Sequence, residues 1–151
     1  MMVSLIEDPV LKQRLGFRPA DDGDAVLVEM WVEPGGGVPP HVHPSMEERF
    51  EVISGELSLL DGRKWQTATA GETVLVPAGK RHAYRNDGSE VTHAVCRATP
   101  PLSLQEFLED AAAMSRAGKL TRQGLPKSPS ALVQALRLAV RHRKMVVMRP
   151  I

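Results

Sequence analysis

The stretch GGGVPPHVHPSMEERFEVISG, residues 35–55, brings two histidines and three glutamates close together in the chain. His41 and His43 are two positions apart, and alternate side chains of a strand point to the same face, so both imidazoles are expected on one face. Two histidines on one face, followed by a carboxylate, are a pattern typical of metal sites. The glycines and prolines before His41 allow the backbone to bend sharply where this strand begins.

Side-chain alternation favours Glu48 over Glu47 as the carboxylate of this site. If Glu48 points inward, then Phe50, two residues later, also points inward. If Glu47 pointed inward instead, Arg49 and Glu51 would follow it into the core, where an unpaired charge is strongly unfavourable. We therefore expect Glu48 to be the ligand.

A second stretch, GETVLVPAGKRHAYRN at residues 71–86, adds a third histidine. His82 follows a tight Pro-Ala-Gly turn and begins a strand on which Tyr84 and Asn86 share its face. Tyr84 is therefore a candidate pocket hydroxyl. The alternative is an ordinary core tyrosine.

Further strand-forming runs surround these two stretches. The runs at residues 25–33, 56–60 and 91–98 are rich in β-branched and other apolar residues, and Gly, Pro and Asp-Gly turns separate them. Residues 1–22 carry little pattern beyond a short lead-in strand or turn. Many short strands between such turns predict an all-β sandwich or barrel.

After residue 100 the pattern changes to two helices, expected at residues 103–117 and 129–144. Ser103 and Glu106 have the spacing of a capping box, in which the serine would be the N-cap of the first helix. Pro129 occupies the first helical position of the second helix, where proline is favoured.

This helical part differs in charge from the rest of the chain. Residues 101–151 carry nine Lys or Arg and three Asp or Glu, a net charge of +6, against −5 for residues 1–100. We expect a β domain at residues 1–100 and a helical extension at residues 101–151 that packs on the barrel or across a dimer. The alternative is that its helices cap the barrel mouth, or that its basic face meets an acidic partner.

Composition limits the class of protein. The 151 residues suit one domain, with 4% aromatic residues and a net charge of +1, so neither a nucleic acid nor a membrane is expected as a partner. The single cysteine, Cys96, excludes an intrachain disulfide and fits a reducing compartment. The N-terminal residues show no signal-peptide pattern, and no apolar run is long enough to span a bilayer. These features predict a cytoplasmic protein.

The two histidine-bearing stretches resemble the two motifs of the cupin superfamily. The first motif, G-x5-H-x-H-x4-E-x6-G, is filled by Gly35, His41, His43, Glu48 and Gly55. The second, G-x5-P-x-G-x2-H-x3-N, is filled by Gly71, Pro77, Gly79, His82 and Asn86. The resemblance covers about residues 25–100 and implies a cupin-type jelly-roll barrel, but it does not explain the helical extension. Together with the two helices expected from the sequence pattern, it predicts a mainly β fold with two C-terminal α-helices. It also implies a homodimer as a common assembly and one divalent metal ion held by His41, His43, Glu48 and His82.

The resemblance leaves the activity open, since cupins include dioxygenases, isomerases, decarboxylases, sugar epimerases, storage proteins and sensor domains. Three histidines and a carboxylate leave open positions on a five- or six-coordinate ion, which suits Mn, Fe, Ni or Co, with Zn also possible. We expect a metal-dependent enzyme acting on a small organic substrate, first an oxygenase and next an isomerase or cyclase. Glu48 and Tyr84 are its candidate catalytic residues. The alternatives are a non-catalytic small-molecule-binding or regulatory module, and a metal-free barrel in which the histidines are ordinary core residues.

Overall fold

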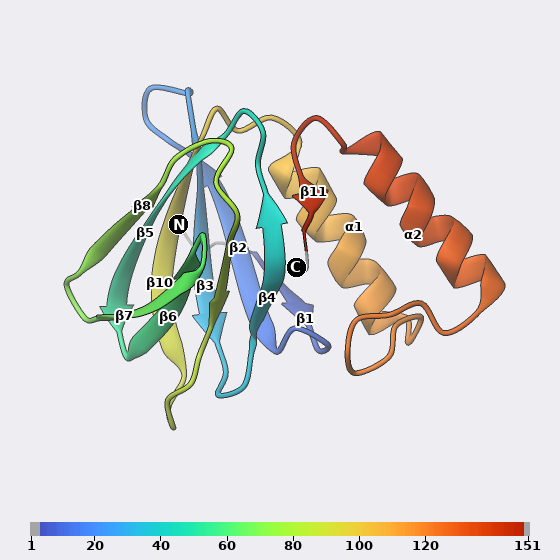
Figure 1. Cartoon of the computed structure of the whole chain (residues 1–151), viewed down its shortest axis with the longest axis horizontal. Coiled ribbons are helices and arrows are strands. Elements are labelled where there is room, and N and C mark those ends of the chain that lie inside the picture. The colour runs from blue at the N-terminus through green and yellow to red at the C-terminus, as the bar shows by residue number, and fades with distance from the viewer. Residues whose placement is uncertain (1–3, 150–151) are drawn as a thin grey trace.

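The computed structural model describes residues 4–149, so residues 1–3 and 150–151 of the two predicted domain ranges lie outside the described residues. Two antiparallel sheets face each other (Figure 1). The six-stranded sheet has the order β1 (Leu5–Asp8), β2 (Gln13–Pro19), β3 (Val26–Val32), β10 (Thr92–Thr99), β5 (Glu47–Ser54) and β8 (Thr73–Val76). The five-stranded sheet has the order β11 (Val147–Met148), β4 (Gly37–Val42), β9 (His82–Arg85), β6 (Glu56–Asp61) and β7 (Lys64–Thr69).

The predicted mainly β, jelly-roll fold is confirmed, with the difference that the two sheets do not join into one closed barrel. The core lies between them and is filled by strands on which buried and less buried residues alternate. Along β3, for example, Val28, Met30 and Val32 are buried while the residues between them are partly exposed. This alternation is what a strand with one face on the core requires.

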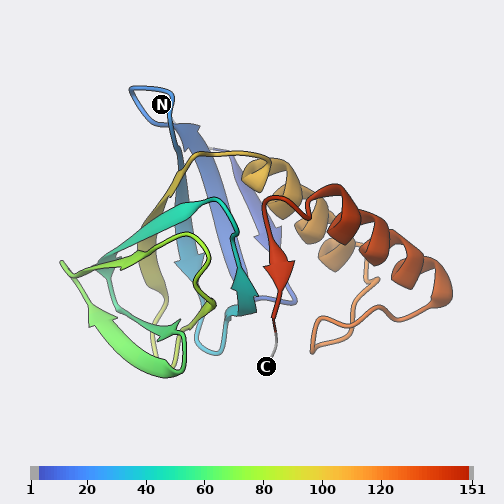
Figure 2. The same ribbon diagram turned by 45° about the horizontal axis from the view of Figure 1, so that its top comes forward.

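The predicted helices are α1 (Leu104–Arg116) and α2 (Pro129–Arg141), which lie side by side on one side of the two sheets (Figure 2). α1 packs against β1, the edge strand of the six-stranded sheet. After α2 the chain returns as β11, which pairs with β4 in the other sheet. The extension therefore connects an edge of one sheet to an edge of the other. Within residues 4–149, no helix has the length and hydropathy needed to cross a membrane.

The expected capping box at the start of α1 is wrong. Ser103 makes no side-chain capping hydrogen bond, and its Oγ instead lies 2.7 Å from Nδ1 of His142, just past the end of α2. A tertiary contact has replaced the local one. By contrast, Ser128 caps α2 by accepting a hydrogen bond from the amide of Ala131 (3.1 Å). α2 ends at Arg141, three residues earlier than expected.

Two other segments also differ from expectation. The region before residue 22 forms two full strands, β1 and β2, rather than one short lead-in. Pro39 and Pro40, expected to precede regular structure, lie within β4, whose pairing with β9 changes register between Val38 and His41. Because proline has no amide hydrogen, a strand that contains two of them cannot pair regularly.

Candidate metal site

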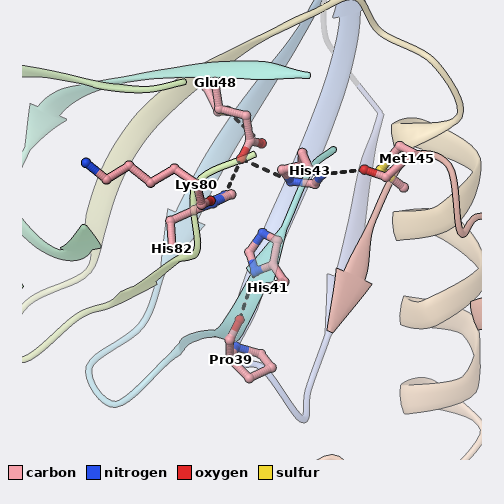
Figure 3. A network of polar contacts seen from close by, with 8 residues as sticks. Pro39, His41, His43, Glu48, Lys80, His82 and Met145 are labelled. Atoms are coloured by element: carbon pink, nitrogen blue, oxygen red, sulfur yellow. Dashed lines mark hydrogen bonds and ion pairs between the residues drawn. The ribbon is translucent and has the colours of Figure 1, made fainter. Parts of the chain in front are cut away.

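The four predicted ligand side chains converge between the two sheets (Figure 3). His41, His43, Glu48 and His82 each offer one ligand atom, and these atoms all lie within 4.8 Å of one another. His41 lies on β4 and His43 just after it, while β5 carries Glu48 and β9 carries His82. Two stretches that are separate in the sequence therefore meet at one point.

Strand pairing explains why the histidines meet. β4 and β9 are antiparallel neighbours, and His41 is the pairing partner of His82. This close approach depends on Gly37, which has φ of +152°, a value that L side chains rarely adopt. A Cβ at Gly37 would overlap the carbonyl group of Tyr84 on β9. Glycine is therefore required here for the backbones to come together.

Glu48 points inward as its position in the strand predicts. It is buried together with Phe50 on β5, whereas Glu47 is exposed. Its Oε1 lies 2.7 Å from Nε2 of His82 and 3.1 Å from Nε2 of His43. Its Oε2 lies 3.3 Å from Sγ of Cys96. Both carboxylate oxygens are therefore held by neighbouring side chains.

The second nitrogen of each imidazole is bound to a backbone carbonyl. Nδ1 of His41, His43 and His82 lies 2.8, 2.8 and 3.0 Å from the carbonyl oxygens of Pro39, Met145 and Lys80, respectively. A carbonyl oxygen only accepts hydrogen bonds, so each Nδ1 carries the hydrogen. In the neutral ring this leaves the Nε2 lone pair directed at the cluster, which is the arrangement that metal-ligating histidines adopt.

This donor set fits a divalent cation. Each imidazole carries its hydrogen on Nδ1, so in the neutral rings the Nε2 atoms have none. The Nε2 lone pairs of His43 and His82 would then face the lone pairs of the Glu48 carboxylate, with no hydrogen between them. Either an imidazole must take up a proton or a cation must lie between the groups. Three imidazole nitrogens and one carboxylate oxygen are ligands for Mn, Fe, Co, Ni or Zn. The residues present therefore suit the metal that the two motifs imply.

Burial and mutual charge set the pKa values of the cluster. Burial, with further contributions from His82 and His43, lowers the pKa of His41 to about 4. Burial also acts to lower the pKa of His43, but the hydrogen bond and charge of Glu48 outweigh it, and the pKa of His43 is raised. Burial acts to raise the pKa of Glu48, yet its hydrogen bonds to His43 and His82 hold that pKa well below the usual range. Glu48 is therefore ionised and His41 neutral at physiological pH.

A cavity of about 710 Å³ extends from this cluster. Its lining includes His41, His43 and Glu48 of the cluster. Between the sheets the lining is mainly apolar and includes Leu15, Val28, Met30, Phe50, Tyr84 and Cys96. Residues of α1, α2, β4, the linker between the helices and the segment around β11 also line it. The cluster is therefore accessible to a small molecule through a largely apolar passage.

Tyr84, the predicted pocket hydroxyl, does line this cavity, but its hydroxyl is already engaged. It donates a hydrogen bond to Oε1 of Gln13, 2.5 Å away. Burial is the largest cause that raises the pKa of Tyr84 above its ordinary value, so the phenol keeps its proton. Tyr84 can position groups in the cavity, but it is poorly suited to accept a proton.

Three participants were not predicted from the sequence. Gln13 alternates with Leu15 and Phe17 on β2, so its inward direction follows from a pattern that is present in the sequence. Burial raises the pKa of the Cys96 thiol, which therefore keeps its proton and donates it to Glu48. Met145 acts through its backbone carbonyl, which no sequence pattern reveals.

Two polar residues of β10, His93 and Arg97, lie away from the cluster. His93 stacks on Trp31 with ring centroids 4.7 Å apart, and its Nε2 lies 2.7 Å from Glu29. Arg97 forms an ion pair with Asp24. These groups form surface interactions of the six-stranded sheet and are not among the residues that line the cavity.

Comparison with known proteins agrees with the cupin motifs in the sequence. Residues 22–96 match the family model described as a cupin domain. The endoribonuclease YbeY of Myxococcus xanthus is 38% identical over 65 residues, which cover 43% of this chain and 22% of that protein. Oxalate oxidase 2 of Hordeum vulgare is 44% identical over 63 residues, which cover 36% of this chain and 28% of that protein. The chain thus matches less than a third of the length of either relative.

Among solved structures, an uncharacterized conserved protein with a double-stranded β-helix domain from Klebsiella pneumoniae superposes with a TM-score of 0.53. The two chains are 26% identical, and the match covers 59% of this chain and 77% of that one.

Proposed function

Because the chain belongs to the cupin superfamily, we propose that it is a metal-dependent enzyme acting on a small organic substrate. In this proposal His41, His43, Glu48 and His82 hold one divalent ion. The observation that supports it most is that all three imidazoles are fixed through Nδ1 on backbone carbonyls, which directs three Nε2 lone pairs toward an ionised carboxylate. Ordinary core histidines would not need this common orientation.

A bound ion would supply Lewis-acid polarisation of a substrate oxygen and, for a redox-active metal, electron transfer. The chain's own residues perform the other tasks. Carbonyl groups hold the imidazoles in place, and the Cys96 thiol orients the second carboxylate oxygen of Glu48. The apolar walls around Met30 and Phe50 exclude water, which strengthens every electrostatic interaction inside the cavity.

Oxidation is our first choice of reaction class. The relative named oxalate oxidase supports oxidation of an organic acid, and the ligand set accepts redox-active metals. An oxygenase or oxidase reaction therefore ranks ahead of isomerisation or cyclisation. Tyr84 and Glu48 remain the catalytic candidates, Glu48 as the anionic ligand and Tyr84 through its hydroxyl oxygen, which can still accept a hydrogen bond while its proton is donated to Gln13.

A second candidate function is binding of a small molecule without turnover. Other titratable groups of the cavity wall are poorly placed for proton transfer, because Tyr84 and Cys96 keep their protons and Asp8 accepts hydrogen bonds from two backbone amides. A metal-centred binding module needs no such group. The binding module would therefore use the same metal site as the proposed enzyme but would not transform its ligand.

The test begins with metal analysis of protein purified without a histidine tag, followed by oxygen-uptake measurements with organic acids, phenols and diketones. We expect about one divalent ion per chain and oxygen consumption with at least one substrate class. Metal uptake without turnover by any class would favour the binding module. Protein that cannot be loaded with metal would overturn the proposal. Light scattering on the same sample tests the homodimer that cupins commonly form.

A further inference from the structure

We infer that the ligand of this site is an amphipathic organic acid, with its oxygen atoms at the histidine cluster and an apolar body extending between the sheets and the helical extension. The inference rests on the proposed function, in which the cluster holds a cation. It adds that the organic acid carries an extended apolar body, which neither the cupin motifs nor the names of the matching relatives specify.

Cavity size is the first argument. The volume of about 710 Å³ lies within the range of about 300–1,000 Å³ that is usual for pockets that enclose drug-sized ligands. A diacid as small as oxalate would fill only a small part of this space. Its remainder would hold water against apolar walls, which is an unfavourable arrangement.

The helical extension supplies the second argument. The residues of α1 that line the cavity are Leu104, Phe107, Leu108, Ala111 and Met114, spaced along one face of the helix. Phe107, Leu108 and Ala111 are only partly buried, so protein atoms leave part of this apolar surface uncovered. α2 adds Ala135, Leu138 and Ala139 from the neighbouring helix. An apolar ligand body would cover this surface.

The distribution of charge orients the ligand. Among the described residues that line the cavity, the acidic ones are Glu48 in the cluster and Asp8, which accepts the amides of Val10 and Leu11. The basic lining residues are Arg85 on β9 and Arg122 and Arg143, which lie outside the helices, so neither α1 nor α2 contributes a charged side chain to the lining. A cation at the cluster would attract a carboxylate or enolate, and the apolar end of the same molecule would then lie against the helices.

Calorimetric titration of the zinc-loaded protein tests this inference without any turnover. The probes are acetate, hexanoate, octanoate and decanoate, with succinate as a compact diacid. We expect the dissociation constant to fall about three- to fourfold for each added methylene, as for transfer of apolar surface from water, and succinate to bind weakly. A dissociation constant that does not change with chain length would overturn the inference.

Filling the helical side of the cavity gives a matched pair of variants. Ala111→Trp places a large side chain in the cavity from α1, whereas Ala113→Trp changes the same helix at an exposed position outside the lining. We expect Ala111→Trp to weaken decanoate binding at least tenfold, and Ala113→Trp to leave it within about twofold. If Ala111→Trp does not fold, Ala139→Trp on α2 takes its place, with the exposed Ser130→Trp as its control.

Zinc uptake, measured on every variant, separates the two proposals. Normal zinc binding with loss of the chain-length dependence in the Ala111 variant supports the inference. Normal zinc binding with equal decanoate affinity in both variants of the pair contradicts it. A wild-type chain that binds decanoate with the expected chain-length dependence but takes up no zinc would sink the proposed metal function and leave the apolar chamber in place.

Discussion

The strands β4, β5 and β9 and the C-terminal extension contribute to the same site in opposite ways. The strands supply His41, Glu48 and His82 through their side chains, at positions that the sequence motifs mark. The extension supplies none of the four ligands, but the Met145 carbonyl fixes the His43 ring, and α1 and α2 line the cavity. The motif residues supply the donor atoms that could hold a divalent ion, whereas a segment distant in the sequence orients one of these residues and lines the space for a ligand.

The largest effect is expected on the strand side, from removal of the carboxylate. Glu48→Ala takes away the one carboxylate of the four-residue cluster and leaves three imidazoles, so zinc affinity should fall at least about a hundredfold. Isothermal titration with zinc measures this loss. The matched control is Glu47→Ala, which removes an exposed carboxylate one position earlier and should leave the affinity unchanged. Equal losses in the two variants would contradict the assignment of Glu48.

A change of pH tests the cluster without any mutation. In the metal-free protein the pKa of His43 is raised, so the protonated imidazole stabilises the folded state at pH values below the ordinary histidine pKa. This contribution to folding stability is lost as the pH rises through the raised pKa of His43. Metal binding requires neutral His43 and therefore has the opposite pH dependence. Over this range His41, with a pKa of about 4, stays neutral, and Glu48 stays ionised.

Zinc affinity should therefore rise by up to about tenfold per pH unit between pH 6 and pH 7, as expected for one displaced proton, and level off above the raised pKa of His43. The increase in melting temperature on adding zinc should likewise be larger at pH 8 than at pH 6. Titrations and thermal melts at the three pH values check this. An affinity that is constant from pH 6 to pH 8 would show that no histidine proton is displaced.

These two predictions concern the part of the molecule that the sequence could predict. Alternation along β5 separates Glu48 from Glu47 because burying Arg49 and Glu51 would be strongly unfavourable, and the structure agrees. The spacing of His41 and His43 likewise predicts a shared direction. Such inferences succeed because they depend only on the two-residue period of a strand and on the cost of burying charge.

Other features could not be predicted, because they depend on contacts between residues far apart in the chain. The Met145 carbonyl accepts from His43, which lies 102 residues earlier, and a backbone carbonyl carries no residue-specific signal. The capping box at Ser103 is wrong because His142 competes for the same hydroxyl. The local sequence pattern predicted α1 correctly, but it could not predict that the Ser103 hydroxyl contacts His142.

Breaking the return of the extension to the sheet tests its proposed influence on the metal site. Val147 on β11 pairs with Val42 on β4, and the Arg149 amide donates a hydrogen bond to the Pro40 carbonyl (3.1 Å). Because every second residue of an antiparallel strand points its amide at the same neighbour, the Val147 amide also points toward β4. Val147→Pro removes this donor close to Met145. We expect about tenfold weaker zinc binding, the size of effect usual for the outer hydrogen bonds of metal-ligating histidines.

The control is Val147→Ala, which shortens the side chain but keeps the amide, and zinc titration of both variants decides the matter. If the proline variant is folded and binds zinc like the wild type, the extension does not control the orientation of His43. The extension would then contribute to the site only by lining the cavity.

The smallest effects are expected within the extension, at the two serines that precede its helices. Ser128→Ala removes a true cap on α2 and should cost about 1 kcal/mol in the free energy of unfolding. Ser103→Ala removes no cap, but it leaves Nδ1 of the buried His142 without its partner, which should cost about 1–2 kcal/mol. Denaturant melts alone would not separate the two causes, because the two losses are similar.

A double-mutant cycle with His142→Leu separates them. If the hydroxyl of Ser103 acts on His142, the cost of Ser103→Ala should fall by about 1 kcal/mol in the His142→Leu background, while the cost of Ser128→Ala should not change. If Ser103 acts as a local cap, its cost should be the same in both backgrounds. The cycle thus tests whether Ser103 stabilises the start of α1 by local capping or through its contact with His142 at the end of α2. The 2.7 Å distance between Ser103 Oγ and His142 Nδ1 favours the contact with His142.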